Sequence, residues 1–259
     1  MKSTIKIINW PYFEGAIWYS LKQNLENGFK ASFSFRFKKT PQASISAKPY
    51  PQNSQPNNSS HSTQFEDQNS YPQDTVSQNI FCFILHNSKE FIDYKKSLPR
   101  NLNEIPEYVA IKFGVSDKRK KKDLMTIENS FSFVQIVYFS KEKAEKFPNE
   151  EMGENNKEKV LFEQNFDSEQ LNFSDEDMYS VRIHYNNENL EIFLSDSGSE
   201  IEPLEGKHHI KLSIKLAKLL NLEMGKGYVG FIQDSRNGTF GIDFLNWKMV
   251  FFLIYFSII

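Results

Sequence analysis

The sequence predicts an all-β protein, an antiparallel β-sandwich or jelly roll formed by a single domain. Apolar character is carried by aromatic residues, which make up 15% of the 259 residues and include 24 Phe. Aromatic and β-branched side chains suit the half-buried surface of a pleated sheet. Several segments alternate apolar and polar residues with a period of two, and the chain has many short strand patterns but hardly any helical ones. This combination is typical of sandwiches and jelly rolls.

The first forty residues contain two predicted strands. Residues 16–19 form a short apolar run, and Asn27-Gly28 is a turn signal that follows it. From Phe29 to Phe37, Phe or Ala alternates with Lys, Ser or Arg, which predicts a strand with one face in water.

Residues 41–79 differ in composition from the rest of the chain. Pro, Gln, Asn and Ser dominate, and large aliphatic residues nearly vanish. Such a segment buries too little apolar area to offset the entropy lost on ordering. We therefore expect a disordered insertion in one domain, since the strands on both sides are parts of one sheet system.

The middle of the chain predicts three strands, at residues 80–85, 108–113 and 131–139. Residues 141–159 are charged and polar and predict a second surface loop. Residues 181–194 predict a hairpin that turns at 186–189.

The C-terminal part predicts a strand followed by a short helix or turn at 210–222, then strands at 227–231 and 243–247. We expect Trp247 to be buried, on the same face of its strand as Leu245. Residues 249–259 form an intensely apolar tail. If it continues the last strand, we expect the row that begins with Phe251 to be exposed, or covered by a second copy or a membrane surface.

Charge and cysteine content exclude several classes of function. The formal net charge of −2, from 31 basic and 33 acidic residues, gives no electrostatic basis for nucleic-acid binding. The single cysteine, Cys82, excludes an internal disulfide framework and a cysteine-rich zinc site. Residues 1–10 lack the apolar core of a secretory leader, which favours the cytoplasm, or the secretory pathway if the N-terminus is incomplete.

The order of these strands resembles the L-type lectins, the legume-lectin-like group with a concanavalin A-like sandwich. The resemblance lies in the residue patterns of 15–19, 28–37, 80–85, 108–113, 181–194 and 227–231, and most specifically in Asp243-Phe244-Leu245-Asn246-Trp247. It implies a concave sheet face that binds sugar, and in many members a Ca²⁺ ion and a transition metal beside it.

The metal site of that family is degenerate in this sequence. The positions that match two carboxylate ligands of the family hold Lys112 and Gly114. Ca²⁺ requires six to eight oxygen ligands, and neither residue offers a side-chain oxygen. We therefore expect no metal ion and no cofactor.

The resemblance also implies where sugar would bind. The family's sugar-binding Asp matches Asn79, whose amide can still hydrogen-bond two hydroxyls. The loop after residue 231 is polar and contains glycine, which favours hydroxyl recognition. The expected carbohydrate-binding residues are Asn79, Gln233, Asp234, Ser235, Asn237 and Gly238.

No catalytic motif accompanies the fold. Glycoside hydrolases on similar sandwiches need paired carboxylates on one strand face, and no E-x-D-x-x-E run occurs. We expect a non-enzymatic carbohydrate-binding module whose partner is a glycan or glycoprotein. The alternative is a protein-interaction sandwich that has lost sugar binding. Oligomers, and membrane contact through the apolar tail, stay open.

Overall fold

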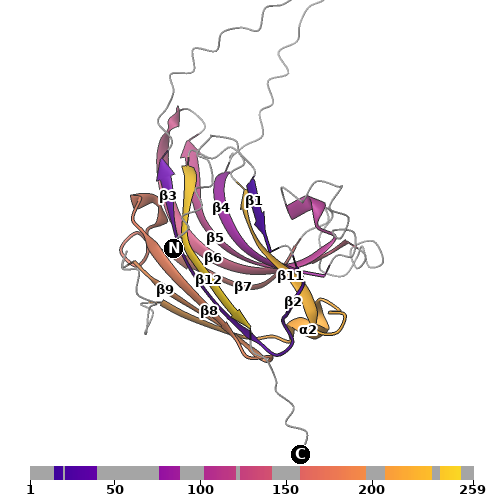
Figure 1. The fold of residues 1–259 in the computed structure, drawn as a ribbon. Coiled ribbons are helices and arrows are strands. Elements are labelled where there is room, and N and C mark those ends of the chain that lie inside the picture. The colour runs from indigo at the N-terminus through magenta and orange to yellow at the C-terminus, as the bar shows by residue number, and fades with distance from the viewer. Residues whose placement is uncertain are drawn as a thin grey trace, which may run out of the picture.

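The protein is an antiparallel β-sandwich, as predicted from the sequence (Figure 1). The computed structural model describes residues 15–19, 21–39, 76–87, 102–120, 123–141, 158–196, 208–234 and 240–251. No helix within these ranges has the length and hydropathy needed to cross a lipid bilayer.

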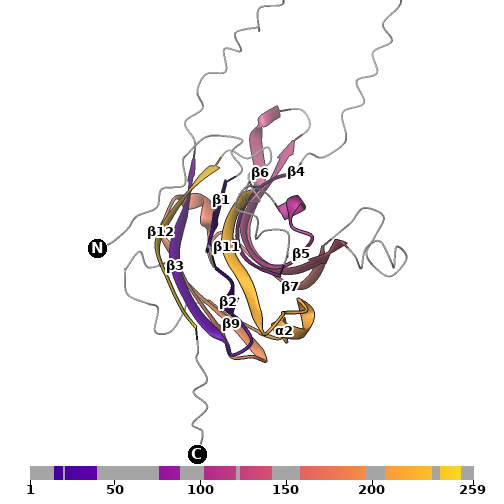
Figure 2. The same cartoon turned by 45° about the vertical axis from the view of Figure 1, so that its right-hand side comes forward.

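One layer is a seven-stranded sheet with the strand order β1-β11-β4-β5-β6-β7, in which β2 also pairs with β11. Its strands are β1 (Gly15–Trp18), β2 (Gln23–Asn24), β4 (Val76–His86), β5 (Glu107–Lys120), β6 (Asp123–Ser140), β7 (Lys159–Phe166) and β11 (Lys226–Asp234). Figure 2 shows that this sheet is strongly curved and that its concave side faces away from the other layer.

The second layer is a five-stranded sheet with the order β10-β9-β8-β3-β12. Its strands are β3 (Phe29–Lys39), β8 (Tyr179–Tyr185), β9 (Asn189–Ser195), β10 (His208–Ser213) and β12 (Phe240–Phe251). Two 3₁₀ helices, η2 (Leu102–Glu104) and η3 (Phe173–Asp175), and the helix α2 (Leu216–Leu219) complete the described elements.

The main core lies between the two sheets and is rich in phenylalanine. The alternation that predicted a strand at 29–37 places every second side chain of β3 in this core, and Phe29, Phe35 and Phe37 have no exposed surface. The opposite face of β3 is polar, with Lys30 and Lys38 exposed. The pattern-based prediction for this strand is confirmed.

The boundaries of the insertion need a correction. The insertion was predicted to reach Asn79, but β4 begins at Val76 and pairs with β5 without interruption from Val76 to His86. Backbone pairing with a long neighbouring strand extends β4 through polar residues that have little strand preference of their own. Residues 41–75 of the predicted insertion, and residues 142–157 of the predicted charged loop, lie outside the described residues.

The predicted hairpin at 181–194 and the predicted strand and short helix at 210–222 are both present, as β8–β9 and as β10 followed by α2. Residues 249–251 of the predicted tail belong to β12 and pair with β3. Phe251 packs against the main core and Val250 is 47% exposed, so the expected orientation of Phe251 was wrong. Residues 252–259 lie outside the described residues.

Trp247 is half-buried against the main core, as predicted, but for a different reason. A register shift between Leu245 and Lys248 interrupts the pairing of β12 with β3. This bulge turns Trp247 to the core side of the sheet, the side of Phe244, because an extra residue inverts the alternation of a strand.

Candidate functional site on the concave face

The concave face of the seven-stranded sheet has an apolar centre. A second buried cluster covers it, separate from the main core, and consists of Ile80, Cys82, Ile84, Leu102, Ile105, Tyr108, Ala110, Phe133, Val137 and Ile232. Leu102 belongs to η2, which lies in the hollow of the sheet in Figure 2. Cys82, the single cysteine of the chain, lies in this cluster with no exposed surface.

Two aromatic rings on this face lie over glycines. A Cβ atom at Gly114 would be 2.3 Å from the Phe133 ring, and one at Gly230 would be 2.2 Å from the Trp18 ring. Any larger residue at either position would have to displace a ring. The position that matches a carboxylate ligand of the family is therefore occupied by a glycine beneath a phenyl ring.

An aromatic row crosses one end of the face. Tyr228, His86, Tyr108 and Phe139 are register partners on four neighbouring strands. His86 stacks on Tyr228 with ring centroids 5.1 Å apart and meets Trp18 edge-on at 5.0 Å. Burial, reinforced by the charge of Lys22, lowers the pKa of His86 from 6.5 to about 3. This imidazole is therefore neutral at physiological pH and serves as an aromatic packing residue.

A polar row crosses the face beside the apolar centre. Lys112, Gln135 and Glu163 are register partners on β5, β6 and β7, and Asn165 lies two residues further along β7. The Glu163 carboxylate accepts hydrogen bonds on both oxygens, at 3.1 Å from Gln135 Nε2 and at 3.3 Å from Asn165 Nδ2. Glu163 and Asn165 are exposed and Gln135 is half-buried, so solvent reaches this trio.

The inner end of the polar row holds a buried cation. Lys112 is only 6% exposed, and its ammonium pairs with the carboxylate of Glu158. The Tyr108 hydroxyl donates a 2.5 Å hydrogen bond to the other oxygen of Glu158. A buried charge is costly unless it is paired, and this arrangement supplies the partner. Within the described residues, no group of three or more His, Cys, Asp or Glu side chains is placed to hold a metal ion.

Three residues of the predicted sugar site are described, and two of them, Asn79 and Gln233, lie away from this face. Asn79 and Gln233 are 0% and 1% exposed. They share the alternation of Phe81 and Phe231, so they face the five-stranded sheet and not the concave side. Asp234 ends β11, with its backbone paired to Ile80. Ser235, Asn237 and Gly238 lie outside the described residues, so the prediction for this loop stays a prediction.

Sequence reasoning missed the polar row. Gln135 lies within a predicted strand, but its neighbours across the sheet depend on register. Glu163 and Asn165 lie in the eight-residue strand β7, whose alternation is weak, with Leu161 and Phe162 adjacent. A strand prediction for 159–166 would have placed the two polar side chains on one face.

No family model matches the sequence, and no curated protein matches it. Among solved structures, the Ca²⁺/Man3GlcNAc-bound lumenal domain of VIP36 gives a TM-score of 0.46 at 8% identity, covering 94% of this chain and 76% of that chain. The carbohydrate recognition domain of Emp47p gives 0.39 at 8% identity, covering 96% and 86%. The CBM2 module of the Dit protein of Lactobacillus casei BL23 phage J-1 gives 0.41 at 9% identity, covering 90% of this chain and 66% of that chain.

Proposed function

We propose that this chain is a non-enzymatic carbohydrate-binding module that recognises sugar hydroxyls on the concave face of the seven-stranded sheet, without Ca²⁺ at Lys112 and Gly114. The observation that carries the proposal is the solvent-accessible trio of Gln135, Glu163 and Asn165. Amide and carboxylate groups held side by side can accept from and donate to neighbouring hydroxyls of one ring.

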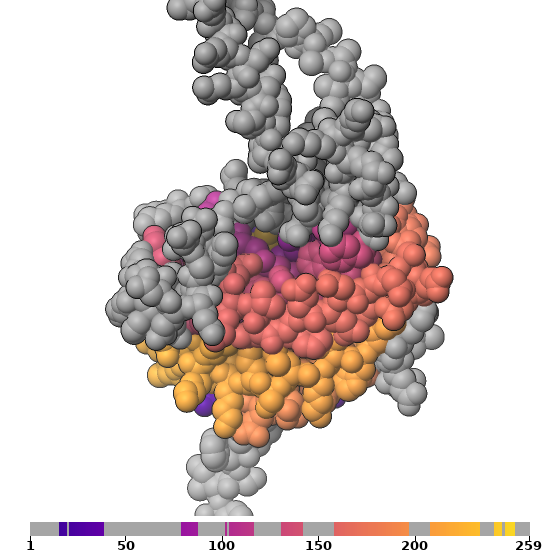
Figure 3. Space-filling view, turned by 180° about the vertical axis from the view of Figure 1, so that it is seen from behind, coloured from indigo at the N-terminus to yellow at the C-terminus, as the bar shows by residue number. Residues whose placement is uncertain are grey.

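The surroundings of the trio favour this use. Phe131 and Phe139 are half-buried rings on the same face of β6 as Gln135 and offer apolar surface to the C–H groups of a sugar. The sheet fixes the backbone of all three polar residues, so little ordering entropy is lost when a ligand binds. Figure 3 shows the hollow on this side of the molecule, with β7 along its rim.

The two carboxylates of the site favour binding over hydrolysis. Cleavage of a glycosidic bond needs one protonated carboxyl group as the acid and a second carboxylate as base or nucleophile. Glu158 faces the ammonium of Lys112, and Glu163 accepts hydrogen bonds on both oxygens. Both carboxylates are thus engaged by partners of their own, an ammonium for Glu158 and two amide groups for Glu163.

A glycan array followed by titration tests the proposal. We expect the wild type to bind at least one class of glycan, and Glu163→Ala to weaken that binding about tenfold or more, because a hydrogen bond to a charged group contributes roughly 1.5–3 kcal/mol. The matched control is Glu191→Ala, which deletes a carboxylate on β9 of the five-stranded sheet, and this variant should bind like the wild type.

Two outcomes would contradict the proposal. Binding that survives Glu163→Ala but is lost on changing the 233–238 segment would move the site to the loop predicted from sequence. A wild type that binds no glycan, yet binds a protein partner, would favour the alternative of an interaction sandwich.

A further inference from the structure

A second cavity lies away from the concave face, at the edge where the two sheets meet. It measures about 480 Å³ and is lined by Leu161, Leu212, Ser213, Ile214, Lys215, Lys218 and Leu219. Leu161 comes from β7 and Leu212 from β10, which are edge strands of the two sheets among the described elements. Figure 3 shows the surfaces of β7 and of the α2 segment side by side at this seam. The volume lies within the range of small-molecule sites, which is about 300–1,000 Å³.

The floor of the cavity is aliphatic. Leu161, Leu212, Ile214 and Leu219 are half-buried, and all four pack against the main core. They offer no hydrogen-bonding group to a ligand. This floor favours a hydrocarbon chain and disfavours a sugar, whose hydroxyls would lose their hydrogen bonds to water without replacement.

The rim of the cavity is cationic. Lys215 pairs with the carboxylate of Glu188 at 3.1 Å, so its charge is balanced. Lys218 is exposed and forms no ion pair with any residue that the structure describes. Ser213 adds a hydroxyl at the same rim. The cavity therefore combines an apolar floor with one unbalanced positive charge.

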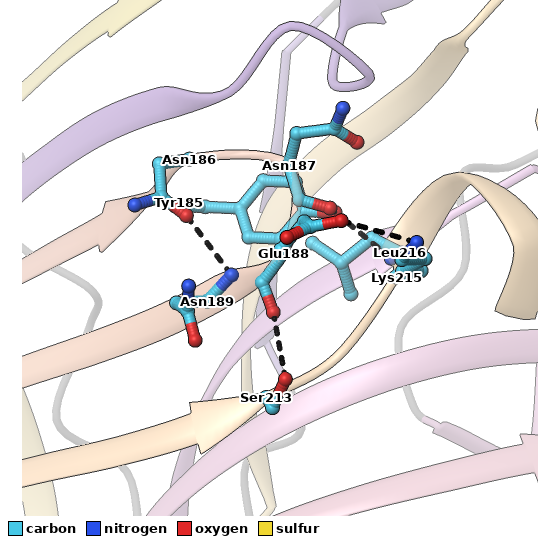
Figure 4. Close-up of polar contacts among 8 residues, drawn as sticks. All are labelled: Tyr185, Asn186, Asn187, Glu188, Asn189, Ser213, Lys215 and Leu216. Carbon is cyan, nitrogen blue, oxygen red and sulfur yellow. Dashed lines mark hydrogen bonds and ion pairs between the residues drawn. The ribbon is translucent and has the colours of Figure 1, made fainter.

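The wall that carries these lysines is held in place by a hydrogen-bond network (Figure 4). The Tyr185 hydroxyl accepts a 3.0 Å hydrogen bond from the backbone N–H of Leu216 and donates one of 2.8 Å to the carbonyl of Asn187. The carbonyl of Glu188 accepts from the N–H of Ile214 at 2.8 Å and from Ser213 Oγ at 3.4 Å. A preformed wall lowers the cost of ordering a ligand.

We propose that this cavity binds a soluble aliphatic monocarboxylate. The hydrocarbon chain lies against the four aliphatic side chains, and the carboxylate pairs with the Lys218 ammonium beside the Ser213 hydroxyl. Charge complementarity selects this ligand class. The carboxylate of Glu188 is already paired with Lys215, so the ammonium of Lys218 is left to bind an anion.

Calorimetric titration with octanoate and with octanol, both as monomers in solution, tests this proposal. We expect octanoate to bind more tightly than octanol, and Lys218→Glu to weaken octanoate at least tenfold while leaving octanol within twofold. Lengthening the carboxylate by one methylene should tighten binding up to about threefold to fourfold. The matched control is Lys211→Glu, which changes an exposed lysine on the face of β10 opposite to Leu212. This variant should leave the affinities for both ligands unchanged.

Methyl NMR locates the ligand without a core substitution. Octanoate should shift the methyl signals of Leu161, Leu212, Ile214 and Leu219 and leave those of the main core interior in place. Equal affinity for octanol and octanoate with no effect of Lys218→Glu would overturn the assignment and leave a plain apolar contact surface. Shifts confined to other methyl groups would overturn it as well.

Discussion

The indole ring of Trp247 meets the phenyl ring of Phe231 edge-on, with ring centroids 5.1 Å apart and an angle of 82° between the ring planes. This contact joins the two sheets, because Trp247 belongs to β12 and Phe231 to β11. Tyr19 meets the same indole edge-on at 5.1 Å. The buried indole Nε1 has no hydrogen-bond partner in the described part of the chain, so this tryptophan contributes through ring packing alone.

We expect Trp247→Ala to lower the free energy of unfolding by about 3–5 kcal/mol, because it leaves a ring-sized cavity between the sheets. Trp247→Phe should cost much less, since it keeps an aromatic ring and removes an N–H group that is buried without a partner. Chemical denaturation of both variants checks this. Equal losses of unfolding free energy in the two variants would show that the size of the indole, not aromatic packing, sets the contribution of Trp247 to stability.

The case of Trp247 shows how far the sequence could predict this structure. Alternation at 29–37 was enough to place Phe33 and Phe35 in the core, because one buried face fixes the register of a strand. The burial of Trp247 was predicted from its apolar neighbours, but the bulge that produces it was not, since an inserted residue leaves no mark in a short pattern. The pairing of Lys112 with Glu158 joins residues that lie 46 positions apart in the sequence, and only the folded chain shows it.

The candidate site was harder to predict than the fold for the same reason. Strand patterns report which residues face the core, and Gln135 and Glu163 face away from it. Their hydrogen bond depends on the register between β6 and β7. Asn79 was chosen by resemblance and Gln233 by the polar composition of its loop, and their alternation with Phe81 and Phe231 would have indicated the inner face.

His86 predicts a pH dependence of stability. Its pKa is about 3 in the folded protein and 6.5 in the unfolded chain, so between these values the unfolded chain binds a proton that the folded protein does not. The free energy of unfolding should therefore fall as pH drops from 6.5 toward 3, by up to about 1.4 kcal/mol per pH unit from this group. Denaturation at pH 7, 6 and 5 measures the slope. His86→Phe should flatten it, and a slope that is unchanged in this variant would contradict the assignment.

Gly114 predicts a coupling with Phe133. A methyl group at position 114 would overlap the ring of Phe133, so Gly114→Ala should destabilise the protein by about 1–3 kcal/mol. In a Phe133→Leu background the same substitution should cost less, because the smaller side chain leaves room. A double-mutant cycle measures the coupling energy. Strictly additive losses would show that the ring moves aside freely.

The same two positions predict how the protein responds to Ca²⁺. We expect a chelator to leave the melting temperature unchanged, because Lys112 brings a positive charge and Gly114 offers no ligand oxygen. The double variant Lys112→Glu with Gly114→Asp should not gain Ca²⁺ affinity, since the new Asp would meet the Phe133 ring and Glu158 would lose its cation. Calorimetric titration of Ca²⁺ into both proteins checks this. A melting temperature that drops by several degrees in chelator would show that the protein holds a structural metal.

Limited proteolysis tests whether the chain is one domain. We expect the first cleavage within residues 41–75, where Pro, Gln, Asn and Ser dominate. The N-terminal fragment should stay bound after cleavage, because β3 pairs with β8 on one side and with β12 on the other, and β1 pairs with β11. Gel filtration of the nicked protein should give one peak that contains both fragments, separable only in denaturant. Fragments that elute apart, each with its own cooperative melting transition, would show two domains instead of one.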